Sequence, residues 1–99
     1  MSKDIIGWVD TNTVGTSDMV VLPAGNRRRY LRFCNGSSSN SLWIMFGQVT
    51  GGQFGIHLTN IHTMEEITRD QIGGLIDTEI HAVAGAAGTQ LTIFVGQDK

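Results

Sequence analysis

The stretch LPAGNRRRYLRFCNGSSSNSLWIMF, residues 22–46, constrains the fold most, because it holds a turn, a strand, a second turn and a second strand in succession. Leu31 and Phe33 alternate with more polar neighbours, which is typical of a strand that has one face on a core. After GSSSNS the run at 42–46 is apolar throughout, β-favouring and too short for a typical helix. We therefore predict a β-hairpin whose second strand is covered on both faces.

Short β-favouring runs separated by turn formers continue along the chain. The segment 75–84 has the clearest period of two, and the runs at 42–46 and 91–95 have the character of central strands of two different sheets. Turns or loops are predicted at 11–18, 47–55 and 69–74. Strands are predicted at 19–22, from 28 to 34, and at 42–46, 56–59, 61–68, 75–84 and 91–95.

These elements predict one all-β domain over residues 1–99, a small antiparallel β-sandwich of about seven short strands. A small barrel is the alternative. A chain of 99 residues is long enough to bury one core. Within residues 1–10 the apolar Ile5, Ile6 and Trp8 form either an edge strand or an N-terminal arm laid on a neighbour.

The charge balance narrows the classes of partner. Seven Lys and Arg against nine Asp and Glu leave a net charge of −2, which argues against binding nucleic acid by charge alone. The start MSKDIIGWVD lacks the features of a secretory signal, and no apolar stretch approaches the ~20 residues of a spanning helix. We therefore expect synthesis and folding in the cytoplasm, with no membrane partner. The single Cys34 cannot form an internal disulfide.

Two segments, RRRYLRFCNGSSSNSLWIMFG and IHAVAGAAGTQLTIFVGQ, carry a family resemblance. Together they resemble small structural proteins of tailed bacteriophages, in which an LPAN-like turn leads into an Arg-rich strand and an aromatic strand ends in FG. The resemblance covers about half of the chain. It implies a β-sandwich of the capsid decoration or cement type, a virion component that binds a major capsid protein or another virion protein, often as a homo-oligomer.

Four of the seven basic residues fall within six positions, at Arg27, Arg28, Arg29 and Arg32. Guanidinium groups pair bidentately with carboxylates, so this cluster could grip a carboxylate-rich neighbour. The alternative is a solvated flank of a turn. A nucleic-acid site is disfavoured, because no second basic patch or aromatic platform accompanies the cluster.

The sequence predicts no catalytic, metal or cofactor site, and therefore a protein that is not an enzyme. The spacing of His57, His62 and His81 matches no short metal-binding signature. Asp77 and Glu79 would share one strand face, as paired catalytic carboxylates do, but polar decoration of an exposed face is the favoured interpretation.

Large apolar side chains on both faces of residues 42–46 exceed what one inner face can bury. We therefore predict self-association through the face that carries Trp43 and Met45. The alternative function is a tail- or fibre-associated module in which Trp8, Tyr30 or Trp43 stacks on a carbohydrate. The complete set of predicted interface residues is Ile5, Ile6, Trp8, Arg27, Arg28, Arg29, Arg32, Trp43 and Met45.

Overall fold

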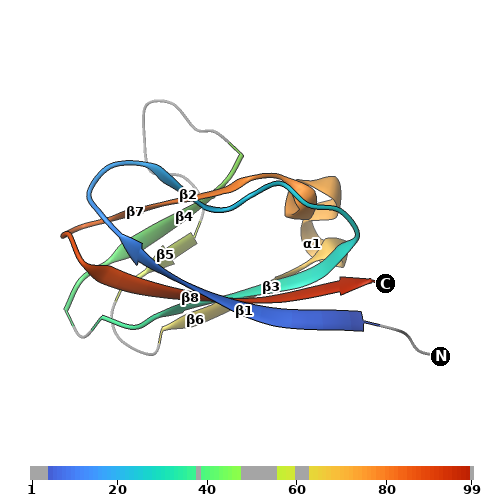
Figure 1. The fold of residues 1–99 in the computed structure, drawn as a ribbon, viewed down its shortest axis with the longest axis horizontal. Helices are drawn as coiled ribbons and strands as arrows, with labels where there is room; N and C mark the ends of the chain where they lie inside the picture. Colours follow the sequence, from blue (N-terminus) through green and yellow to red (C-terminus); the bar gives the residue numbers. More distant parts are fainter. Residues whose placement is uncertain (1–4, 38, 48–55, 60–62, 99) are drawn as a thin grey trace.

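Two antiparallel sheets pack face to face in the computed structural model (Figure 1). The structure describes residues 5–37, 39–47, 56–59 and 63–98, and it describes residues 5 and 6 by their backbone alone. In spatial order the first sheet consists of β1 (Ile5–Val14), β8 (Thr89–Asp98), β3 (Arg28–Asn35) and β6 (Met64–Thr68). The second sheet consists of β2 (Met19–Leu22), β7 (Ile80–Ala84), β4 (Leu42–Phe46) and β5 (Ile56–Leu58). Because each sheet is open at both edges, the predicted β-sandwich is confirmed over the barrel.

The core lies between the sheets and follows from strand alternation. Leu31 and Phe33 of β3 and Ile44 of β4 are fully buried, as their period of two predicts. Phe33 meets Phe46 edge-on, with ring centroids 6.1 Å apart and an interplanar angle of 65°. β4 and β8 are interior strands of different sheets, so this prediction from their apolar runs is confirmed.

The predicted hairpin is wrong, because β3 and β4 belong to different sheets. β3 pairs with β6 and β8, whereas β4 pairs with β5 and β7. The buried side chain of Asn35 fixes the crossing between sheets: its amide nitrogen donates to the carbonyl oxygens of Asn40 at 2.8 Å and Leu58 at 3.1 Å. Its amide oxygen accepts the backbone N–H of Ser37 at 2.8 Å. Asn35 therefore binds backbone groups of the connection between β3 and β4 and of β5, which holds the crossing in place.

The predicted loop at 11–18 begins later than expected, because β1 continues through Val14. Val14 is fully buried in the core, and the side-chain amide of Asn12 donates to the carbonyl oxygen of Val21 at 3.1 Å. The turn-forming residue types in this segment are held in a strand by a ten-residue ladder with β8. β1 lies at the edge of the first sheet, which corresponds to the edge-strand alternative.

The region 69–84 also differs from its prediction. The predicted turn is a short helix, α1 (Arg69–Ile72), followed by a 3₁₀ helix (Gly73–Asp77), and the predicted strand 75–84 begins only at Ile80. The side chain of Gln71 accepts the backbone N–H of Thr68 at 2.8 Å, which begins α1. The strands predicted at 56–59 and 61–68 are confirmed as β5 and β6, whereas most of the loop at 47–55 lies outside the described residues.

Candidate functional site

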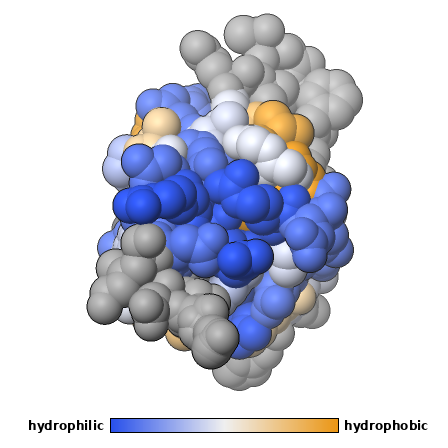
Figure 2. All heavy atoms as spheres, turned by 90° about the vertical axis from the view of Figure 1, so that its right-hand side faces the viewer, coloured by the Kyte–Doolittle hydropathy of each residue, from blue (hydrophilic) through white to orange (hydrophobic). Residues whose placement is uncertain are grey.

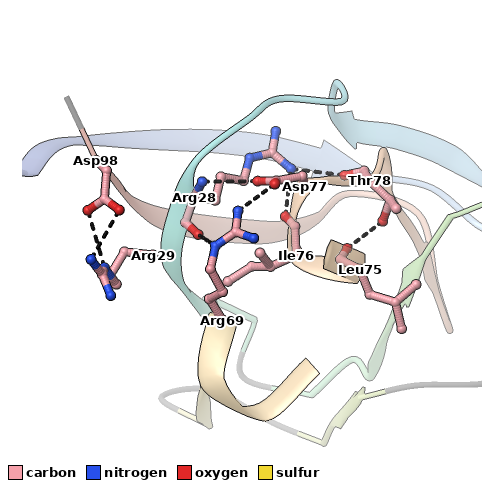
Figure 3. Close-up of polar contacts among 8 residues, drawn as sticks. All are labelled: Arg28, Arg29, Arg69, Leu75, Ile76, Asp77, Thr78 and Asp98. Atoms are coloured by element: carbon pink, nitrogen blue, oxygen red, sulfur yellow. Dashed lines mark hydrogen bonds and ion pairs between the residues drawn. The ribbon is translucent and has the colours of Figure 1, made fainter. Parts of the chain in front are cut away.

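Arg28 binds several backbone groups at the end of the sandwich where β3 begins (Figure 3). Only 2% of Arg28 is exposed. Its Nη1 donates to the carbonyl oxygens of Ile76 at 3.1 Å and Thr78 at 2.9 Å, and its Nη2 donates to that of Pro23. A side chain on Gly25 would come within 2.9 Å of this guanidinium, which explains the glycine in the LPAGN turn. Arg28 therefore holds internal segments together, and its buried guanidinium lies outside the predicted docking surface.

Asp77 joins these contacts from the 3₁₀ helix. Its Oδ1 accepts the backbone N–H of Arg28 at 2.9 Å, and its Oδ2 pairs with Arg69, whose Nε donates to the carbonyl oxygen of Arg28 at 2.9 Å. Burial raises the pKa of Asp77, but the hydrogen bonds and charges of Arg69 and Arg28 outweigh it and the pKa is lowered overall. Burial lowers the pKa of Arg28, and the charge of Asp77 opposes that effect. The charged groups of Arg28, Arg69 and Asp77 thus connect β3, α1 and the 3₁₀ helix at this end of the sandwich.

The other predicted arginines are exposed. Arg29 forms a bidentate ion pair with Asp98, with N–O distances of 3.2 and 3.1 Å, and Arg32 pairs with Glu66 across β3 and β6. Arg27 has a φ of 53° at the turn into β3. The end of the molecule that lies to the right in Figure 1, with α1 and the C-terminus, has a mostly hydrophilic surface (Figure 2).

The predicted N-terminal segment, in β1, is separated from the arginines of β3 by the intervening strand β8. In the β1–β8 ladder Ile5 is opposite Asp98, the partner of Arg29. Trp8 is 38% exposed and Val9 is 54% exposed. The side chains of Ile5 and Ile6 lie outside the described residues, so only their backbone is placed.

Trp43 and Met45 share the outer face of the second sheet, since Leu42 and Ile44 point into the core. The Trp43 ring is partly exposed and stacks on His57, with centroids 4.5 Å apart and an interplanar angle of 5°. Met45 is only 3% exposed. Of the two apolar side chains predicted to be exposed on this face, only Trp43 is therefore partly exposed.

His81 forms a buried ionisable site beside Met45 on this outer face, and sequence reasoning missed it. Its Nδ1 lies 2.8 Å from Asp18 Oδ2 and its Nε2 lies 2.7 Å from Glu79 Oε1. Burial lowers the pKa of His81, but the hydrogen bonds and charges of Asp18 and Glu79 outweigh it and the pKa is raised overall. The spacing of Glu79 and His81 was visible in the sequence, whereas Asp18 is 63 residues away from His81.

The remaining candidates do not form a common site. Asp77 binds arginines and Glu79 binds His81, so the two carboxylates have separate roles. Cys34 is a free, half-buried thiol, and His62 lies outside the described residues. Within the described residues, no three His, Cys, Asp or Glu side chains are placed so that they could hold one metal ion, and no pocket is found. No described helix is long and apolar enough to span a membrane.

Comparisons with known proteins identify a fold relative. No family model matches the chain, and no curated protein matches it. The chain is similar to one in a solved structure of Bacillus endospore appendages, described as a novel family of disulfide-linked pili, with a TM-score of 0.50 and 11% identity. The match covers 99% of this chain and 91% of that one. At this identity the likeness concerns the fold alone.

Proposed function

We propose that this chain is a non-catalytic structural subunit that binds and stabilises a bacteriophage capsid shell. The observation that carries the proposal is the register of β1 and β8, in which Ile5 lies opposite Asp98 and Asp98 binds Arg29. The register therefore brings the backbone of the N-terminal segment and the Arg29–Asp98 ion pair, far apart in sequence, to the same end of the first sheet, on either side of β8. A subunit that docks by contact area needs a surface with apolar groups for affinity and charged groups for register.

The ion pairs of Arg29 and Arg32 suit this role, because both are solvent-exposed. An exposed ion pair contributes little to stability, so either arginine can exchange its carboxylate for one on a shell at small cost. Arg28 cannot do so, since its guanidinium is bound to three internal carbonyl groups. The proposed docking surface consequently consists of the β1 segment with Arg27, Arg29 and Arg32.

The fold supports an assembling role in a general way. A similar fold occurs in the chain described above from disulfide-linked pili, and a pilus is an assembly of subunits. We do not extend the disulfide linkage of those pili to this chain. A chain with one cysteine can form a disulfide with one other subunit only, so disulfides could not join many subunits in series.

The carbohydrate-binding alternative has less support. Trp8 lies on the edge strand of the first sheet, whereas Trp43 lies on the outer face of the second and stacks on His57. Tyr30 packs against Gly96 within the first sheet. These rings do not form one stacking platform for a sugar.

The test is occupancy of capsid shells that lack this chain, after mixing with purified variants at several salt concentrations. Arg29→Ala combined with Arg32→Ala should lower occupancy, while Gln90→Ala, an exposed change at the opposite end of β8, should not. Circular dichroism and urea unfolding should confirm that both variants are folded. Failure of the wild-type chain to bind shells, or full occupancy by the double variant at every salt concentration, would overturn the proposal.

A further inference from the structure

The sandwich has four edge strands, and they differ in how far they are protected from pairing with another chain. β5 has three residues, and β2 has four and is followed by Pro23. β6 has five residues, two of which are adjacent glutamates. Short length, charge and proline are the devices by which proteins block edge-to-edge pairing. Each of these three edges has at least one of them.

β1 is the exception among the four edges. It has ten residues with no proline and no Lys, Arg or Glu, and its one charged residue is Asp10. It pairs with β8 on one side, so alternate N–H and C=O groups point away from the sheet on the other. Its middle is also the apolar exposed part, because Trp8 and Val9 are 38% and 54% exposed. Farther along the strand, the side-chain amide of Asn12 donates to the carbonyl oxygen of Val21 in the second sheet.

We infer that β1 pairs antiparallel with β1 of a second copy of this chain, about a two-fold axis at Val9. An antiparallel strand is complementary to its own copy, since a two-fold axis exchanges donors and acceptors between the two strands. The stretch 7–11, in which all residues but the partly buried Asp10 are exposed, is centred on Val9, so an axis at Val9 pairs all five of these residues. Trp8 then lies opposite Asp10 of the second copy, whereas an axis at Asp10 would set two carboxylates against each other.

The resulting dimer has a continuous eight-stranded sheet, made by joining two four-stranded sheets through their β1 edges. Two Val9 side chains, now 54% exposed, cover each other across the axis. This inference concerns the free protein, whereas the capsid proposal concerns binding to a shell, and both use the β1 segment, so a shell and a second copy would compete for it. The two are tested separately, by sedimentation and by shell occupancy.

The decisive experiment is sedimentation equilibrium of the full chain and of variants with like or opposite charges at the axis. Val9→Lys alone and Val9→Glu alone should each be monomeric, because two like charges would face each other, while an equimolar mixture should restore the dimer. Val20→Lys is the matched control, since Val20 is 43% exposed on the protected edge strand β2. That variant should remain dimeric.

A cross-linking experiment keeps the inference testable if the charged variants fail to fold. In a Cys34→Ser background, mild oxidation should convert Val9→Cys almost completely into a covalent dimer, because directly opposite residues in an antiparallel pair approach within disulfide range. Thr13→Cys, farther from the axis on the same face of β1, should form little covalent dimer. A wild-type monomer at high concentration would overturn the inference. Equal dimerisation of all variants, or equal cross-linking at both positions, would also overturn it.

Discussion

The backbone N–H of Arg28 donates to Asp77 Oδ1 at 2.9 Å, across 49 residues of sequence. This bond joins the first residue of β3 to the 3₁₀ helix before β7, and so connects the two sheets at one end of the sandwich. The same aspartate binds Arg69 from α1. Arg28, which lies among exposed arginines in the sequence, therefore has a structural role in the folded protein.

Replacing Arg28 with alanine should lower the free energy of unfolding by about 3 kcal/mol, because carbonyl groups of Pro23, Ile76 and Thr78 lose a charged donor in a buried place. Urea unfolding monitored by tryptophan fluorescence measures the change. The adjacent Arg29→Ala is the matched control and should cost less than about 1 kcal/mol, since its ion pair is exposed. Equal costs for the two variants would contradict the internal role of Arg28.

Gly96 should not tolerate alanine. A Cβ on Gly96 would lie 2.6 Å from the Cδ2 and Cζ atoms of the Tyr30 ring, so the ring would have to leave its position. We expect Gly96→Ala to lower the free energy of unfolding, measured with urea, by about 1–3 kcal/mol. Gly7, its partner in the β1–β8 ladder, is the control, because a Cβ there meets only the Val95 carbonyl oxygen at 3.5 Å. Gly7→Ala should be neutral or slightly stabilising. A well-tolerated Gly96→Ala would show that the Tyr30 ring moves freely.

The stability should fall as the pH rises above the ordinary pKa of histidine. The pKa of His81 is raised in the folded state, so its charged form contributes stability that is fully present below about pH 6.5. That contribution is lost as the pH rises through the folded-state pKa. Urea unfolding between roughly pH 6 and pH 9 should show the decline.

The groups that face His81 are the carboxylates of Asp18 and Glu79, with neutral Met45 and Val20 opposite it on the flanking strands. In His81→Gln the decline over this pH range should disappear, because glutamine has no titratable group. His57→Gln should retain it. A pH profile of His81→Gln that parallels the wild type would rule out this source.

Asn35→Asp should destabilise the chain by about 2 kcal/mol or more at neutral pH. The amide nitrogen of Asn35 donates to the carbonyl oxygens of Asn40 and Leu58, and a carboxylate oxygen in its place would face both acceptors without a proton. Protonation restores one donor, so the loss relative to wild type should shrink at low pH. Thermal unfolding at two pH values measures this. Asn26→Asp, an exposed change in a turn, is the control.

The strand pattern of the core could be predicted from sequence because it is local. Alternation at Leu31 and Phe33 requires only the geometry of an extended backbone, and the run at 42–46 requires only its apolar character. Both hold in the structure. The candidate site was less predictable, since exposure separates Arg28 from Arg29 and Arg32 although all three are of the same residue type.

The sequence by itself determined that the chain forms β-strands, which face of β3 is apolar, and that β4 and β8 are interior strands. Only the tertiary structure decided that β3 and β4 enter different sheets, that Arg28 is buried and that His81 meets Asp18. The physical reason is the range of the interactions. Alternation acts between residues two apart, whereas strand partners and the burial of a polar group depend on contacts as distant as the 63 residues between Asp18 and His81.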